Sequence, residues 1–432
     1  MFEVREKPDK VELALLVGVC FDKREEPEAK NLLNELVELV DTLGIEIAQH
    51  LLIYVRGQNK SYLMGKGKKD EMLELAKELG VDVIIFDNQL SPAQQKNWEE
   101  ESDLTVIDRE EVILDIFAMR AHTKEAQLQV ELAKMEYVLP RMTRMWTHLD
   151  RQRGGSGGGK GGKGASRGEG EQQIEVDRRL ARKKISNVKA ELEVVRRQRA
   201  TQRKERDRNP IPHAAIVGYT NSGKSTLLNK LSDSSILAKD MLFATLDTTT
   251  RRIELPDGQP MLLTDTVGFI RNLPHRLIEA FKGTLEEAVI ADFLIHVLDA
   301  SSEQVFQFHE TTLSVLKELG AADKKIVTVL NKIDLVEDKN RLIELQNEFG
   351  GATMISLQTG EGMEQLLLTV NEVLRDRVDR FELRIPQARA DLVSQLHREC
   401  KVLSEDYDGN DVLITAIIPY TMIHLFEAFA SS

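Results

Sequence analysis

The sequence predicts a multidomain α/β protein: an N-terminal α/β domain with a helical hairpin, a doubly wound domain and a small C-terminal α/β module. Three observations support this fold class. At 432 residues the chain exceeds one ordinary domain. Short apolar runs alternate with helix-like stretches near both ends of the chain. A glycine-rich pattern typical of phosphate-binding loops follows an apolar run in the middle.

Residues 1–110 are expected to form a small α/β domain with a mostly parallel sheet. Ser91 before Pro92 is typical of a helix start, because the serine caps the helix and proline fits its first position. The string Gly65-Lys-Gly-Lys68 lacks the spacing of a phosphate loop, so we expect a turn there. The expected strands are 13–19, 45–55, 81–86 and 104–107, and the main helices are 27–43 and 69–79.

Residues 111–208 are expected to form an antiparallel helical hairpin. Two long helix-like stretches, 111–153 and 171–208, each carry an apolar stripe. Between them, residues 154–170 hold 10 glycines with Lys160, Lys163 and Arg167. Such a segment cannot hold a fixed fold alone. It is either a flexible linker or a loop that contacts RNA phosphates.

Charge is distributed unevenly along the chain. The formal net charge is -13, yet residues 178–208 hold 13 Lys or Arg against 4 acidic residues. This asymmetry predicts a basic element for a phosphate-rich partner on an otherwise acidic protein. Two distant cysteines argue against a disulfide framework or a zinc site. We expect a cytoplasmic monomer without a signal peptide or a transmembrane segment.

Residues 209–378 are expected to form the doubly wound domain, beginning at Asn209-Pro-Ile-Pro212. Gly218-Tyr-Thr-Asn-Ser-Gly-Lys224-Ser225 matches the phosphate-loop pattern, whose backbone N–H groups surround a β-phosphate. Asn331-Lys-Ile-Asp334 selects the base, because an aspartate there accepts hydrogen bonds from N1–H and the 2-amino group of guanine. The order of these strings predicts GTP binding and a P-loop GTPase fold.

A magnesium ion is expected beside the phosphates. The Ser225 hydroxyl is the expected first protein ligand and Thr245 the second, with Thr248, Thr249 and Thr250 as rivals. Asp265 would hold the metal through water, and the Gly268 N–H would contact the γ-phosphate. The residues expected to contact GTP are Gly218, Tyr219, Thr220, Asn221, Ser222, Gly223, Lys224, Ser225, Phe243, Ala244, Thr245, Leu246, Asp247, Asp265, Thr266, Val267, Gly268, Asn331, Lys332, Ile333, Asp334, Ser356, Leu357 and Gln358.

The residue that orients the attacking water in Ras-like enzymes is missing. Phe269 stands where those enzymes have a glutamine, and a phenyl ring cannot hydrogen-bond water. We therefore expect slow intrinsic hydrolysis or a substitute group. Lys224 and Asn221 are the expected catalytic residues, with Asn221 holding a potassium ion between the phosphates. The alternative is that Asn221 tolerates an unusual backbone angle.

Residues 379–432 are expected to form the C-terminal module, with a strand, a helix over 388–403, a strand over 412–418 and a final helix.

The chain resembles the HflX family of GTPases over nearly its whole length. Outside the GTP-binding strings the resemblance depends on Gly65-Lys-Gly-Lys68, Leu90-Ser-Pro-Ala-Gln94, Ile107-Asp-Arg109, Ile113-Leu-Asp-Ile-Phe117, Leu128-Gln-Val-Glu-Leu-Ala133, Trp146-Thr-His-Leu149 and Asp177-Arg-Arg179. It implies GTP hydrolysis, binding to the large ribosomal subunit, and a role in dissociating stalled ribosomes or assisting subunit maturation. The chain departs from the family at Glu169, where proline is usual, which alters the expected tip of the hairpin.

A different class of function stays open from the residues. A GTP-switched signalling or scaffold protein would use the basic stretch on a protein or membrane partner. A polybasic membrane element is expected beside a lipidation site or an apolar face, and the sequence offers neither.

Overall fold

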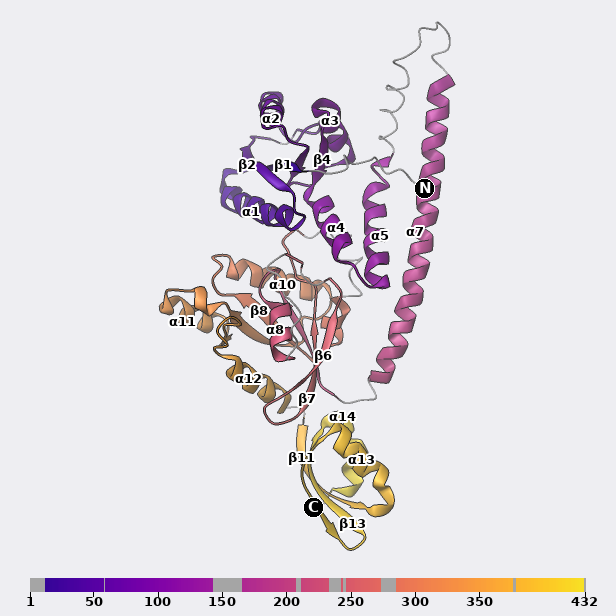
Figure 1. Cartoon of the computed structure of the whole chain (residues 1–432), viewed down its shortest axis with the longest axis vertical. Helices are drawn as coiled ribbons and strands as arrows, with labels where there is room; N and C mark the ends of the chain where they lie inside the picture. Colours follow the sequence, from indigo (N-terminus) through magenta and orange to yellow (C-terminus); the bar gives the residue numbers. More distant parts are fainter. Residues whose placement is uncertain are drawn as a thin grey trace. The chain divides into compact units, whose positions relative to one another are not determined.

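The computed structural model describes residues 12–57, 59–142, 165–206, 211–232, 242–243, 246–272, 285–375 and 378–430. The chain divides into two compact units, one of Met1–Val194 with Asn272–Phe281 and one of Val195–Arg271 with Lys282–Ser432. The first unit holds a four-stranded sheet, and the second holds a six-stranded and a three-stranded sheet (Figure 1). The mixed α/β class expected from the sequence is confirmed.

The N-terminal sheet is parallel throughout, in the order β2-β1-β3-β4. Alternate residues of β1, Leu15 and Val17, pack with Met72 of α2 and Trp98 of α3 in one buried core. Parallel strands need helical crossovers, which the intervening helices supply. The elements are β1 (Leu13–Cys20), α1 (Glu26–Thr42), β2 (Glu46–Tyr54), α2 (Lys66–Leu79), β3 (Val83–Phe86), α3 (Pro92–Ser102) and β4 (Thr105–Asp108).

Two helix starts in this domain test the sequence predictions. Ser91 caps α3 as expected: its hydroxyl accepts from the Gln94 N–H, and the Gln94 side chain accepts from the Ser91 N–H. The prediction of a turn over Gly65-Lys-Gly-Lys68 is wrong for its last three residues, which are helical. Gly65 is the N-cap and α2 begins at Lys66, because glycine adopts the extended cap conformation without a side-chain cap.

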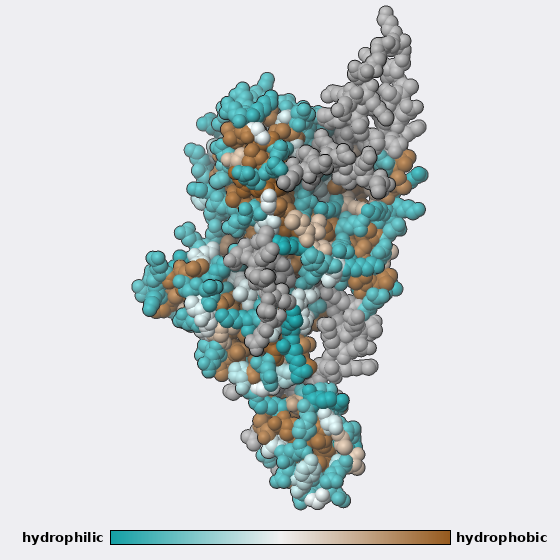
Figure 2. Space-filling model, in the orientation of Figure 1, coloured by the Kyte–Doolittle hydropathy of each residue, from teal (hydrophilic) through white to brown (hydrophobic). Residues whose placement is uncertain are grey.

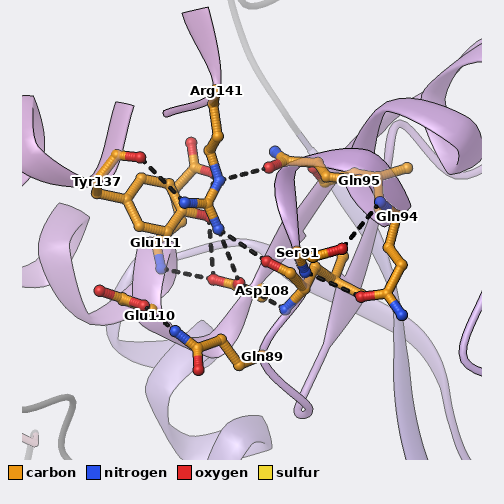
Figure 3. Close-up of polar contacts among 11 residues, drawn as sticks. Gln89, Ser91, Gln94, Gln95, Asp108, Glu110, Glu111, Tyr137 and Arg141 are labelled. Carbon is orange, nitrogen blue, oxygen red and sulfur yellow. Dashed lines mark hydrogen bonds and ion pairs between the residues drawn. The ribbon is translucent and has the colours of Figure 1, made fainter. Parts of the chain in front are cut away.

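A buried carboxylate joins three segments of this unit (Figure 3). Asp108 is fully buried and accepts hydrogen bonds from the Leu90 N–H at 3.0 Å and the Tyr137 hydroxyl at 3.1 Å. Arg141 donates to the Leu90 carbonyl and to Asp108, and its guanidinium lies 3.5 Å from the centroid of the Tyr137 ring. These bonds satisfy a charge that would otherwise be costly to bury.

The helical hairpin differs from the prediction in its first arm. Residues 111–138 form two helices, α4 (Arg109–Arg120) and α5 (Lys124–Val138), rather than one. The break falls where Thr123 caps α5 through the Ala126 N–H. The second arm is one helix, α7 (Ala165–Arg206), so residues 165–170 are helical and not part of a loop. The glycine-rich residues 154–164 and the string at Trp146 lie outside the described residues.

Helix α7 packs beside α5 (Figure 1). Val188 and Leu192 of α7 are buried, four residues apart on one face. Ion pairs join the two helices at Lys184–Glu131, 2.6 Å, at Lys189–Glu136, 2.8 Å, and at Lys124–Glu191, 3.9 Å. The apolar stripe predicted for this helix therefore faces α5 over part of its length.

The nucleotide-binding sheet has the order β10-β9-β8-β5-β7-β6. All neighbours are parallel except β6, which runs antiparallel to β7 at the edge. The predicted doubly wound sheet is confirmed. Its elements are β5 (His213–Gly218), α8 (Lys224–Leu231), β6 (Thr249–Glu254), β7 (Pro260–Asp265), β8 (Phe293–Asp299), α10 (Val305–Glu318), β9 (Lys325–Asn331), α11 (Lys339–Glu348), β10 (Thr353–Met354) and α12 (Met363–Arg375).

The C-terminal module contains a strand that the sequence prediction missed. The helix expected to reach residue 403 ends at Glu399, and the next residues form β12. Exposed residues of β12 interrupt the alternation that signals a strand, because β12 is an edge strand with a register shift. The elements are β11 (Val378–Pro386), α13 (Ala390–Glu399), β12 (Lys401–Asp408), β13 (Asp411–Pro419) and α14 (Tyr420–Phe426).

Hydrophilic and hydrophobic residues are interspersed on the face shown in Figure 2. None of the helices in the described part of the chain has the length and apolar character needed to cross a membrane.

Candidate GTP-binding site

The phosphate loop joins β5 to α8, and glycines at its two ends permit its path. Gly218 has φ +149°, and a Cβ there would lie 2.3 Å from the Val297 carbonyl oxygen. Gly223 has φ +100°, and a Cβ there would lie 2.3 Å from the Asn331 amide nitrogen. Side chains are thus excluded at both positions. The loop can present backbone N–H groups to an anion at the start of α8.

Lys224 is buried at the first position of α8. Its ammonium donates to the Tyr219 carbonyl at 2.6 Å. Burial lowers the pKa of Lys224 to about 8, and the nearby Asp265 carboxylate opposes part of this shift. A bound phosphate would supply the negative charge that this buried ammonium needs.

Two oxygen-bearing side chains that the sequence predicts near a magnesium ion lie together. The Ser225 hydroxyl donates to Asp265 Oδ2 at 2.6 Å. A hydroxyl and a carboxylate are the hard oxygen donors that Mg²⁺ prefers, so this pair fits the ion that GTPases use. Bound there, Mg²⁺ would neutralise charge on the β- and γ-phosphates.

The expected second metal ligand, Thr245, lies outside the described residues together with Ala244. Of its rivals, Thr249 and Thr250 open β6. The Thr250 hydroxyl shares a 2.8 Å hydrogen bond with Thr264, which in turn contacts His213 at 2.7 Å. Thr250 is therefore engaged in linking strands β6, β7 and β5.

The switch turn after β7 is tied to the phosphate loop. The Phe269 N–H donates to the Gly218 carbonyl at 3.0 Å, and the Thr220 N–H donates to the Phe269 carbonyl at 2.8 Å. A Cβ on Gly268 would lie 2.9 Å from both Thr220 Cα and the Lys224 ammonium. The Phe269 side chain is buried. A buried phenyl ring cannot take over the role of the missing glutamine.

Asn221 adopts φ +58° and its side chain is exposed. Asparagine is one of the few residues that tolerates this left-handed conformation. The observed φ agrees with the alternative that Asn221 is present because it tolerates an unusual backbone angle. Its side chain is exposed, so a role in binding a cation can be tested directly.

Asn331 links the guanine strings to the phosphate loop. Its amide donates to the Ser222 carbonyl at 2.8 Å, and its oxygen accepts from the Leu357 N–H at 3.3 Å. Lys332, with φ +62°, pairs with Asp299 at 2.7 Å. Asp334 and Gln358 are exposed, and Ser356 is buried. The three loops predicted to surround the nucleotide thus meet in the fold.

Some predicted contact residues point into the domain instead. The buried Thr266 hydroxyl donates to the Ile216 carbonyl at 2.7 Å, which anchors the switch turn to β5. The buried residues Val267, Phe243 and Leu246 and the partly buried Ile333 also have inward or shielded side chains. Any contact of these residues with GTP would come from their backbone.

Sequence reasoning missed residues that position the loops. Lys230 of α8 donates to the Leu357 carbonyl at 2.7 Å. Arg271 donates its N–H to the Tyr219 hydroxyl at 2.8 Å, and the Tyr219 ring stacks on Phe308 of α10. These residues belong to no motif with fixed spacing, so the sequence alone carried no signal for them.

A doubly wound sheet with this phosphate loop, an adjoining Ser–Asp pair and the Asn331-Lys-Ile-Asp334 string defines a P-loop GTP hydrolase. Family models match in three segments. Residues 30–118 match the GTP-binding GTPase N-terminal region, residues 120–206 match the GTP-binding GTPase middle region, and residues 213–332 match the 50S ribosome-binding GTPase family.

Individual relatives extend over nearly the whole chain. A GTPase HflX of Akkermansia muciniphila is 58% identical, with 99% of each chain covered. A GTPase HflX of Escherichia coli strain K12 is 41% identical, covering 90% of this chain and 89% of the relative. The chain belongs to the HflX family of GTPases. A crystal structure of a GTP-binding protein from Sulfolobus solfataricus in complex with GDP is 24% identical, covers 84% of this chain and 99% of that chain, and has a TM-score of 0.44.

Proposed function

We propose that this GTPase acts in the cytoplasm on the large ribosomal subunit, where it dissociates stalled ribosomes or assists subunit maturation. The basic helix α7 is the single observation that carries the proposal. Its described side chains include the exposed Arg179, Arg182, Lys183 and Arg196. Exposed cations on one long helix suit a phosphate backbone. The match to a family described as a 50S ribosome-binding GTPase supports the same partner.

Residues 1–110, 111–208, 209–378 and 379–432 are proposed as the functional domains. In this division the hairpin binds ribosomal RNA and residues 209–378 bind GTP or GDP. Ser225 and Thr245 are the proposed protein ligands of Mg²⁺. Lys224 and Asn221 are the proposed catalytic residues.

The ribosomal partner is tested by sedimentation of the full chain with large subunits across a salt series, in GTP, GDP and a non-hydrolysable analogue. The exposed residues Arg179, Arg182, Lys183 and Arg196 are replaced together by alanine. Each lost phosphate contact should reduce the salt slope by about 0.9 for duplex-like nucleic acid and weaken binding. GTP affinity should stay unchanged, because the contacts described for the phosphate loop come from other residues, namely Lys224, Phe269 and Asn331.

A matched control removes four exposed cations elsewhere, at Arg252, Lys317, Lys339 and Arg398. It changes the net charge equally and should retain the wild-type salt slope. Equal loss of binding in both variants would show that only overall charge matters. Unchanged sedimentation of the α7 variant would overturn the proposal and leave a protein or membrane partner for the GTPase.

We also propose that hydrolysis is slow in isolation, is accelerated by the large subunit, and uses a potassium ion held by Asn221. Supply of a missing catalytic group in trans is worth about 10³–10⁵ in rate in known GTPases. Single-turnover rates are compared in K⁺ and Na⁺, with and without subunits. Asn221→Gly keeps the positive φ and removes the amide. It should abolish a K⁺ advantage, whereas retention of that advantage would leave only the backbone role.

A further inference from the structure

Tyr219, in the phosphate loop, makes contacts through its main-chain carbonyl, its hydroxyl and its ring. Its main-chain carbonyl accepts from the Lys224 ammonium at 2.6 Å. Its hydroxyl accepts from the Arg271 N–H at 2.8 Å. Its ring stacks on Phe308 with 3.9 Å between centroids and an angle of 12° between planes. The residue is 4% exposed, so these contacts lie in the interior of the domain.

The second contact fixes the far side of the switch turn. Phe269 is held by two backbone bonds to the phosphate loop, one through Gly218 and one through Thr220. Two residues later, the N–H of Arg271 has the Tyr219 hydroxyl as acceptor. Gly268 directly precedes this stretch. The position of its N–H, which would meet the γ-phosphate, therefore depends on how firmly residues 269–271 are held.

Helix α10 provides the support behind Tyr219. The Arg271 guanidinium donates to Gln307 at 3.3 Å and lies 5.6 Å from the centroid of the Phe308 ring. The same aromatic ring thus contacts Tyr219 on the phosphate loop and Arg271 on the switch turn. Stacked aromatic pairs and hydrogen bonds shielded from water are stiffer than exposed contacts.

We propose that Tyr219 is a positioning residue for GTP hydrolysis: it couples the phosphate-loop lysine to the switch turn and fixes the turn for reaction. The link to the lysine is the hydrogen bond from the Lys224 ammonium to the Tyr219 carbonyl. The link to the switch turn is the hydrogen bond from the Arg271 N–H to the Tyr219 hydroxyl. With Phe269 buried and unable to orient water, the placement of the turn rests on such backbone anchors. The inference depends on the assignment of the phosphate site made above.

Tyr219→Phe is the direct test, because it deletes one oxygen and keeps the stacking ring. A buried N–H left without its acceptor loosens the turn. Single-turnover GTP hydrolysis should slow about tenfold, while the dissociation constant for GDP should stay within about twofold. Hydrogen exchange of the segment containing Arg271 should accelerate. Tyr219→Leu, which also loses the stack, should slow hydrolysis further.

Tyr407→Phe is the matched control. Its hydroxyl also makes one hydrogen bond, to Glu405 at 2.6 Å, but in the C-terminal module. It should leave the hydrolysis rate unchanged. An unchanged rate in Tyr219→Phe would overturn the inference, as would a proportional loss of GDP affinity and rate, which would mean general destabilisation.

Lys224→Ala separates this inference from the site assignment. Loss of GDP binding in Lys224→Ala, with normal hydrolysis in Tyr219→Phe, would overturn the positioning role alone. Retained nucleotide binding in Lys224→Ala would overturn the assignment of the phosphate site and this inference with it.

Discussion

The N-terminal sheet is parallel throughout and the GTP-binding sheet is parallel except for β6, but the carboxyl ends of their parallel strands are used differently. In the N-terminal sheet, Asn88 exchanges two hydrogen bonds with the backbone of Val19, at 2.7 and 2.9 Å. Arg109 pairs there with Asp87 and Glu35, each at 2.8 Å. In the GTP-binding sheet, a loop bounded by glycines follows β5 instead.

This contrast shows how side-chain chemistry decides what a parallel sheet edge does. Helices follow both edges, and both could in principle attract a ligand. Long polar side chains satisfy the N-terminal edge from within the domain. At the carboxyl edge of the GTP-binding sheet, glycines exclude side chains. Backbone N–H groups and a buried lysine can therefore bind an anion there. The carboxyl edge of the N-terminal sheet, called the closed edge below, is stabilising. The carboxyl edge of the GTP-binding sheet, called the open edge below, is functional.

The largest expected effect comes from breaking the closed edge with Arg109→Leu. The buried Glu35 and the partly buried Asp87 would lose their shared cation. Removal of one partner from a buried ion pair costs about 3–5 kcal/mol. Urea unfolding followed by tryptophan fluorescence, to which Trp98 in the core of this domain contributes, measures the loss. Arg24→Ala, at an exposed ion pair with Asp22, should unfold as wild type does. GDP affinity should be retained, and its loss would contradict the separation of the two edges.

A smaller effect, confined to nucleotide choice, is expected at the open edge. Asp334→Asn should weaken GTP binding about 100-fold, because hydrogen bonds to a charged group contribute about 1.5–3 kcal/mol each. The same variant should shift preference toward xanthosine nucleotides, whose 2-oxo group needs a donor. Equilibrium titration with both nucleotides measures the change, and thermal unfolding without nucleotide should be unaffected. Wild-type GTP affinity in this variant would place the guanine pocket elsewhere.

The smallest effect concerns acid stability beneath the open edge. His296 of β8 is fully buried and stacks on His309 of α10 at 5.1 Å. Burial lowers the pKa of His296 from 6.5 to about 3, with smaller effects of His309 and Lys224 in the same direction. Between pH 6.5 and about 3, the imidazole of His296 therefore binds a proton in the unfolded state but not in the folded state. Stability from this group is complete above pH 6.5 and declines as the pH falls toward 3, by about 2 kcal/mol at pH 5.

His296→Gln should remove this contribution to the acid-side slope of unfolding free energy. His50→Gln, at an exposed position of β2, is the control and should keep the slope. An identical pH dependence in wild type and His296→Gln would show that the buried imidazole is not the group that titrates.

Sequence reasoning performed well where one local pattern decides the structure. The alternation of strands and helices, the cap at Ser91 and the order of the GTP-binding strings all follow from neighbouring residues. It failed where two patterns compete. The break between α4 and α5 at Thr123 interrupts an apolar stripe that continues on both sides. Strand β12 lies at a sheet edge, where exposure weakens the alternation that identifies strands.

The sequence by itself determined the class of chemistry, because the phosphate-loop pattern, the serine expected to bind the metal and the aspartate expected to select guanine are each defined by residue type and spacing. Only the tertiary structure decided how these parts are held. Asn331 bridges two loops. Tyr219 contacts Arg271, which is 52 positions later in the sequence, and Phe308, which is 89 positions later. Contacts between residues so far apart depend on the packing of sheet and helix, and no local pattern specifies them.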